Sequence, residues 1–140
     1  MTADKSSQDV IYDGQTYQPV FRKDLLSAKH NVVVSCVEVR YKYAPYLPET
    51  LQELMHNGIE VSVHIKKVGA QETALSAVGI NIVQSEKLSV NCAIIDKSIV
   101  WYGSVNFFGY NSEEANIMRL TDTSVANEMM EVIYANETDE

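Results

Sequence analysis

Hydrophobic positions along the first third of the chain change from a helical to a strand spacing. Apolar residues recur at helical spacing within residues 20–29, which predicts a short amphipathic helix. A nearly continuous β-branched run follows at residues 31–39, and such a run is typical of a strand covered on both faces. The polar segment through about Gln15 predicts a loose lead-in instead.

The same alternation continues through the middle of the chain. Apolar residues within 49–57 share one helical face, and the pattern ends at Gly58. Residues 60–66 alternate with period two, residues 71–78 have helical spacing, and residues 80–84 form another apolar run. Strands that alternate with helices in this way are typical of a parallel sheet.

The alternation of predicted strands and helices ends in the last third of the chain. Residues 89–95 and 99–105 are predicted strands separated by three residues, a gap of hairpin length that begins with a turn-forming aspartate. A strand at 115–120 and a helix at about 124–134 complete the pattern. The helix is expected to turn four residues inward: Val125, Met129, Val132 and Ile133. We therefore expect an α/β fold with a mixed, mostly parallel sheet and helices on both faces.

Length and composition favour one domain. A chain of 140 residues that is 46% apolar can bury a single core, and we expect a flexible lead-in at 1–15, one domain at 16–136 and an acidic tail at 137–140. No apolar run is long enough to span a membrane, and the start lacks the apolar core of a signal peptide, which predicts a cytoplasmic location. Cys36 and Cys92 lie in apolar runs, where unpaired buried thiols are expected.

The net charge of −8 opposes a nonspecific grip on nucleic acid, because that affinity comes mainly from neutralised phosphates. The charge is unevenly distributed, however. Of the eleven Lys and Arg residues, only Arg119 lies after Lys97. An acidic carboxyl-terminal part could therefore mask a locally neutral or basic face.

The predicted hairpin carries the most informative motif. Asp96 is followed after six residues by Gly103 and Ser104, and Asn106 comes two residues later. Four fixed residues at fixed spacing arise by chance roughly once in 10⁵ positions. This pattern resembles the phospholipase D superfamily motif H-x-K-x4-D-x6-G-S-x-N, and the resemblance extends over about residues 20–134, including the strand entry after Gly58.

The sequence departs from that motif at its two reactive positions. The resemblance implies a histidine nucleophile at position 89 and a phosphate-holding lysine at position 91, but the chain has Ser89 and Asn91. A serine hydroxyl needs a positioned base to attack, and an asparagine carries no charge to stabilise the transition state of phosphoryl transfer. By analogy with protease variants, loss of a nucleophile costs on the order of 10⁶ in turnover. The resemblance still implies phosphate binding by three residues: Gly103, Ser104 and Asn106.

Most of these motif residues also have a structural interpretation. Glycine at 103 permits a close backbone approach, and Ser104 can bond to neighbouring main chain. Asp96 matches the motif, but a role as the hairpin turn residue alone also explains it. Glu114 lies where the resemblance implies a carboxylate that steadies the histidine, although Glu113 and Glu114 are also explained as an exposed acidic pair.

A cluster after the first predicted strand mixes aromatic rings with cations, as nucleic-acid or partner contacts do. Its members are Arg40, Tyr41, Lys42 and Tyr43. Tyrosines that cover the edge of the core beside a proline loop explain the same pattern. Trp101, Tyr102 and the aromatic residues of 107–110 are expected mostly in the core and the pocket wall, although residues 107–110 could also form a dimer seam.

The three histidines have ordinary explanations. His30 and His56 lie near predicted helix ends, and His64 lies on the polar side of an alternating strand, with a smaller chance of facing the cleft. No pair has the spacing of zinc ligands, so we expect no metal and no cofactor.

The sequence thus favours a catalytically inactive phospholipase D-like domain that serves as a binding or assembly module. The resemblance implies nucleic acid as the ligand, within a helicase- or nuclease-type system. The alternative is a working phosphodiesterase or nuclease with a non-standard site. The resemblance implies chemistry that needs two facing motifs, so one motif per chain predicts a homodimer through the motif hairpin or a second phospholipase D-like domain. We expect no membrane partner.

Overall fold

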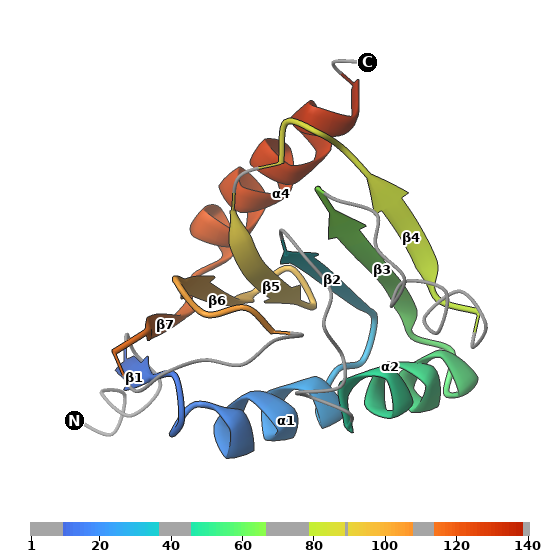
Figure 1. Ribbon diagram of the computed structural model, residues 1–140. Coiled ribbons are helices and arrows are strands. Elements are labelled where there is room, and N and C mark those ends of the chain that lie inside the picture. The colour runs from blue at the N-terminus through green and yellow to red at the C-terminus, as the bar shows by residue number, and fades with distance from the viewer. Residues whose placement is uncertain (1–9, 37–45, 67–78, 89, 108–113, 139–140) are drawn as a thin grey trace.

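A computed structural model describes residues 10–36, 46–66, 79–88, 90–107 and 114–138 (Figure 1). In chain order the elements are β1 (Val10–Asp13), α1 (Gln18–Leu26), β2 (Asn31–Cys36), α2 (Tyr46–His56), β3 (Glu60–Ile65), β4 (Asn81–Gln84), β5 (Asn91–Ile95), β6 (Ile99–Gly103), β7 (Asn116–Thr121) and α4 (Thr123–Thr138). The helix predicted at residues 71–78 lies outside the described residues.

The described strands form one seven-stranded mixed sheet in the order β1-β7-β6-β5-β2-β3-β4. The β2, β3 and β4 strands pair in parallel, as the alternation of strands and helices predicts. The other four pairings are antiparallel, so the expectation of a mostly parallel sheet was wrong. The reason is that β5 of the β5–β6 hairpin lies next to β2 and runs in the opposite direction. The strands β6, β7 and β1 then each add a further antiparallel pairing.

The amino-terminal segment contributes the edge strand β1, which sequence reasoning had assigned to a loose lead-in. Val10 to Asp13 pair antiparallel with Arg119 to Asn116 of β7. Asp13 then ends the strand in a turn, because its carboxylate accepts the backbone N–H groups of Gln15 and Thr16 at 2.8 Å each. Pro19 at the first turn of α1 suits a helix start, where the missing N–H has no helical partner.

The helices α1 and α2 pack side by side against one face of the sheet, and we call this face A (Figure 1). An aromatic cluster of Tyr17, Phe21, Trp101 and Phe107 lies between α1 and the sheet. All four rings are at most 1% exposed. Trp101 and Phe107 are therefore core residues, as the sequence pattern predicts, whereas Tyr102 is 44% exposed and lies outside the core.

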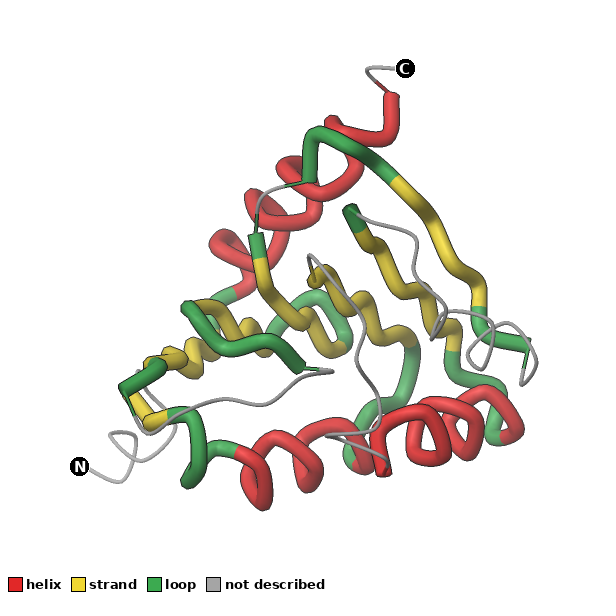
Figure 2. Tube along the Cα trace, in the orientation of Figure 1, coloured by secondary structure: helices red, strands yellow, loops and turns green. Residues whose placement is uncertain are grey.

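The helix α4 covers the opposite face, face B, so helices lie on both faces as predicted (Figure 2). Ala126 and Ile133 of α4 are buried against Val33, Ile94 and other residues of the sheet. Val132 is 43% exposed, however, so its predicted inward position was wrong. The helix continues to Thr138, beyond the predicted end at about residue 134.

A buried ion pair joins α1 to β7. Asp24 is 8% exposed and accepts hydrogen bonds from the Arg119 guanidinium at 2.6 and 3.0 Å and from Trp101 Nε1 at 2.8 Å. The hydrogen bonds from Arg119 to Asp24 raise the pKa of the guanidinium, against the opposing effect of burial. Arg119, the last lysine or arginine along the chain, thus stabilises the packing of α1 on the sheet.

Cys36 and Cys92 are both buried and unpaired, as expected. Burial raises the pKa of the Cys92 thiol to about 12. No helix within the described ranges is long and apolar enough to cross a membrane.

Candidate functional site

The motif is built on the hairpin formed by β5 and β6. Asn91, at the start of β5, pairs with Gly103 at the end of β6, and the strands stay in register to Ile95 and Ile99. Asp96 and Lys97 form the turn with φ values of 55° and 54°. Two successive positive φ values match the right-handed twist of a hairpin, and aspartate tolerates this region.

The open end of the hairpin lies at the carboxyl edge of the parallel strands. Because β5 runs antiparallel to β2 and Cys92 pairs with Ser35, Asn91 lies beside the end of β2. Open α/β sheets gather their ligands at this edge. Asn91 and Asn106 are half-buried, and Ser104 is exposed. The pairing of Asn91 with Gly103 places these two motif positions at one edge of the sheet.

Gly103 permits a very close backbone approach at this edge. A Cβ atom added to Gly103 would lie 2.3 Å from the Asn116 carbonyl oxygen and 2.7 Å from Ile117 Cα. Both neighbours are backbone atoms of β7 and cannot move aside without opening the sheet. The structural interpretation of Gly103 thus has direct geometric support.

Ser104 bonds to the main chain of β7. Its N–H and its hydroxyl donate to the Asn116 carbonyl at 2.8 and 3.3 Å, and the hydroxyl accepts the Asn116 N–H at 3.0 Å. These bonds extend the β6–β7 pairing beyond the end of β6. A ligand oxygen would have to share or displace them to bind the hydroxyl.

Asp96 is not brought to the motif edge, because it lies at the opposite end of the hairpin. Its carboxylate accepts the N–H groups of Lys29, His30 and Asn31 at 2.7 to 3.1 Å. Burial raises the pKa of Asp96, but these backbone hydrogen bonds outweigh it and lower the pKa below 3.8. Asp96 therefore joins the β5–β6 turn to the start of β2, and the turn interpretation explains it fully.

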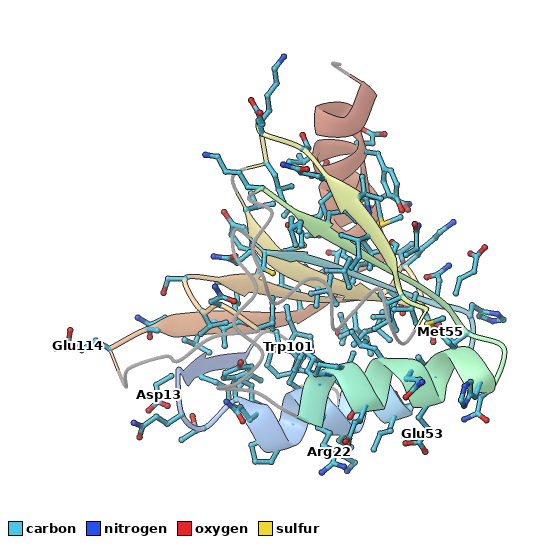
Figure 3. All side chains as sticks on the ribbon, turned by 45° about the vertical axis from the view of Figure 1, so that its right-hand side comes forward. Asp13, Arg22, Glu53, Met55, Trp101 and Glu114 are labelled. Carbon is cyan, nitrogen blue, oxygen red and sulfur yellow. The ribbon has the colours of Figure 1, made fainter. Side chains whose placement is uncertain are left out.

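Glu114 is exposed just before β7 and projects away from the sheet (Figure 3). Its carbonyl accepts the Asn116 side-chain N–H at 3.2 Å. Ser89 and Glu113 lie outside the described residues, as does the aromatic and basic cluster of Arg40, Tyr41, Lys42 and Tyr43.

His64 is buried on face B, so its placement on a solvated strand face was wrong. It is 2% exposed, its ring edge meets Tyr134 of α4 at a centroid distance of 4.9 Å, and Ser62 Oγ lies 3.3 Å from its Nε2. Burial lowers its pKa to about 4, so the ring is neutral at physiological pH. The polar residues of β3 looked solvated because the sequence gives no sign that α4 covers them.

None of the three histidines, all of which lie in the described part of the chain, takes the place of the motif histidine. His30 precedes β2 at the amino edge and His56 ends α2, and both are exposed. His64 lies two strands from β5, on face B, whereas Asn91 points to face A with Ala93. Within the described ranges, no three His, Cys, Asp or Glu residues gather as a metal site requires.

A shallow depression of about 400 Å³ next to the motif was missed by sequence reasoning. It is lined by Ile11, Tyr102, Gly103, Ser104, Asn116, Ile117 and Met118. Ile11 and Tyr102 are 65% and 44% exposed and, with Met118 between them, form a cross-strand row on face B. The adjacent rings of Trp101 and Tyr102 were the available signal, because successive residues on a strand point to opposite faces of the sheet and Tyr102 lies opposite the buried Trp101.

No protein-family model and no curated protein sequence matches the chain. Solved structures do match. The phospholipase D family member Nuc from Salmonella typhimurium superposes over 93% of both chains with a TM-score of 0.78 and 15% identity. NucT from Helicobacter pylori superposes over 94% of this chain and 96% of its own, with a TM-score of 0.73 and 14% identity.

The chain therefore has the phospholipase D-like fold. The fold expected from the motif is thus confirmed. The same fold matches TrmBL2, an archaeal chromatin protein with a novel mode of DNA binding, at a TM-score of 0.73 and 11% identity. That match covers 99% of this chain and 55% of TrmBL2.

Proposed function

We propose that this chain is a non-cleaving phospholipase D-like module that binds nucleic acid and assembles as a homodimer through its motif hairpin. The observation that carries this proposal is the composition of the motif edge. Asn91 lies opposite Gly103 where a lysine would be expected, and each histidine of the chain is placed elsewhere. An edge of amide and hydroxyl groups can hydrogen-bond to a phosphate. It lacks the histidine nucleophile and the lysine charge that the motif supplies.

Nucleic acid is the ligand that the fold comparisons favour, since one structural neighbour is described as DNA-binding. The net charge of −8 predicts that the affinity for nucleic acid is modest. Binding by amides and hydroxyls also predicts a shallow salt dependence. A steep fall of affinity with salt would instead assign the contact to the lysines and arginines of the amino-terminal two thirds.

The row formed by the exposed Ile11 and Tyr102, with the half-buried Met118 between them, supports assembly through the motif hairpin. This row lies directly beside Gly103 and Ser104, so a second copy that covers it would also lie next to the motif edge. A symmetric contact of this kind is the commonest arrangement of homodimers.

Turnover tests the proposal first. The protein is incubated in EDTA with bis-p-nitrophenyl phosphate and with single- and double-stranded DNA, because the family resemblance implies metal-independent chemistry. We expect no turnover and a gel shift with DNA. Turnover that disappears in Asn106→Ala would overturn the proposal and establish the alternative, a working phosphodiesterase.

A restored motif provides the matched positive control. The double variant Ser89→His and Asn91→Lys completes the motif letters while leaving the rest of the hairpin unchanged. We expect it to gain phosphodiesterase turnover of at least about 10²-fold over the parent, since general acid–base and nucleophilic groups contribute at least this much. Loss of DNA binding in Asn106→Ala, without turnover in the parent, would support the binding role.

A further inference from the structure

A second pocket lies at the amino edge of the sheet, at the opposite end of the strands from the motif. The register places Asn31 opposite Glu60 and Ser62 opposite Asn81, and alternation from Val33 puts all of these residues on face B. The helix α4 closes one side of this pocket with Met130 and Tyr134. The volume is about 400 Å³, enough for a small metabolite.

The lining combines three kinds of group. Val33, Met130 and Tyr134 supply an apolar wall, Ser62 and Asn81 supply hydrogen-bonding groups, and two ionisable residues lie at the rim. The rim residues are Glu60 at the start of β3 and Lys97 at the β5–β6 turn, and both are exposed.

The Asn31 side chain provides an independent indication of a ligand. Its Oδ1 is buried and has no hydrogen-bond partner among the described residues, although Asn31 lines the pocket. Buried polar atoms are nearly always hydrogen-bonded, so an unpartnered acceptor at a pocket wall is available to a donor from a bound molecule. A ligand that carries an N–H group would satisfy this oxygen.

The charges at the rim narrow the class of ligand. Glu60 pairs with Asn31 across β2 and β3, so a carboxylate and an unpartnered amide oxygen lie on neighbouring strands. Both attract an ammonium group. Lys97 supplies the complementary cation for a carboxylate. A doubly charged phosphate would face Glu60, so a nucleotide suits this rim less well than a zwitterion.

We propose that this pocket binds a free α-amino acid. The ammonium group donates to Asn31 Oδ1 beside Glu60, the carboxylate meets the Lys97 ammonium, and the side chain lies between the sheet and the Met130 and Tyr134 wall. The site is independent of the proposed nucleic-acid function, because it uses the other edge of the sheet.

The binding test uses NMR titration of the ¹⁵N-labelled full chain with L-glutamine and with L-methionine. We expect saturable shifts at Asn31, Ser62 and Tyr134 and none at Asn91 or Gly103. The N-acetyl derivative lacks the ammonium group and the α-carboxamide lacks the carboxylate. Each should bind at least about tenfold more weakly than the parent amino acid. Equal binding of these analogues, or the absence of saturable shifts, would overturn the proposal.

Variants separate binding from folding. Asn31→Leu replaces the unpartnered amide with an apolar group of similar size, so it should abolish binding without lowering the melting temperature. Lys97→Asn removes the charge but keeps a residue that tolerates the positive φ of the turn, and it should weaken binding at least about tenfold. The matched control is Gln84→Leu, an exposed amide on the other face of β4, which should bind as the parent does. If Lys97→Asn and Gln84→Leu behave alike, the amino-acid assignment is wrong.

Discussion

At the scale of single residues, Gly103 is the motif position with the least freedom. A methyl group at this position would overlap the Asn116 carbonyl and Ile117 Cα of β7. We expect Gly103→Ala to lower the free energy of unfolding by about 2 to 3 kcal/mol, because the sheet must open to admit the new atom. Urea denaturation measures this loss. Gly58→Ala is the comparison, since its Cβ meets nothing within 4 Å and its cost comes only from a φ of +87°.

Asp96 is predicted to act through stability. We expect Asp96→Ala to cost about 2 to 3 kcal/mol, because three backbone N–H groups lose a charged acceptor and alanine tolerates the positive φ of this turn poorly. The folded pKa is lowered, so the contribution is present above the unfolded value of 3.8 and is lost as pH falls through the folded value. Denaturation at pH 7 and at pH 3 should therefore show a larger difference between parent and variant at pH 7. An equal difference at both pH values would contradict this role.

Sequence reasoning found the motif residues but could not decide between their functional and structural interpretations. The identity of Ser104 does not reveal that its hydroxyl bonds to Asn116, because that contact depends on the pairing of β6 with β7. The unpartnered Oδ1 of Asn31 was likewise invisible, since only the packing of α4 and β3 around it creates a pocket.

At the scale of elements, the ion pair of Asp24 and Arg119 holds α1 on the sheet. Asp24→Ala leaves the Arg119 guanidinium partly buried without its carboxylate, so we expect a loss of about 3 to 5 kcal/mol. The double variant Asp24→Leu and Arg119→Met removes both charges and should recover part of that loss, because the buried Trp101 Nε1 still lacks its acceptor. If the double variant is as unstable as the single variant, the loss of stability does not come from the unpaired charge of Arg119.

His64 couples the packing of α4 on β3 to pH. Its folded pKa of about 4 lies below the ordinary 6.5, so between these values the unfolded chain binds a proton that the folded chain does not. The free energy of unfolding should therefore fall by about 2 to 3 kcal/mol at most as pH drops from 6.5 to 4. Chemical denaturation across this range should show a smaller fall in His64→Gln. The exposed His56→Gln serves as control and should keep the parent's pH dependence.

Most elements were predictable from periodicity, because helical and strand spacing each reflect one buried face. The strand β1 was missed since it has four residues in a polar segment and gains its order only from β7. The balance of parallel and antiparallel pairs was also missed. Local patterns indicate strands, but the insertion of the β5–β6 hairpin next to β2 is a long-range choice.

At the scale of the whole molecule, the exposed row beside the motif predicts the oligomeric state. A single motif edge and an uncovered apolar row of Ile11, Met118 and Tyr102 occupy the same end of the sheet. If two copies meet there, both features are explained by one symmetric contact. We therefore expect a dimer by light scattering coupled to size-exclusion chromatography.

The decisive variant is Ile11→Asp, which places a charge in the centre of the proposed contact. It should yield a monomer with an unchanged melting temperature in dilute solution, because Ile11 is 65% exposed and contributes little to the monomer core. Leu26→Asp is the matched control, since Leu26 is 48% exposed at the end of α1 and away from the motif. A dimer that persists in Ile11→Asp but dissociates in Leu26→Asp would place the interface on α1, and the two motif edges would then not face each other. DNA binding that is lost together with the dimer would indicate that two edges are needed to hold one nucleic-acid strand.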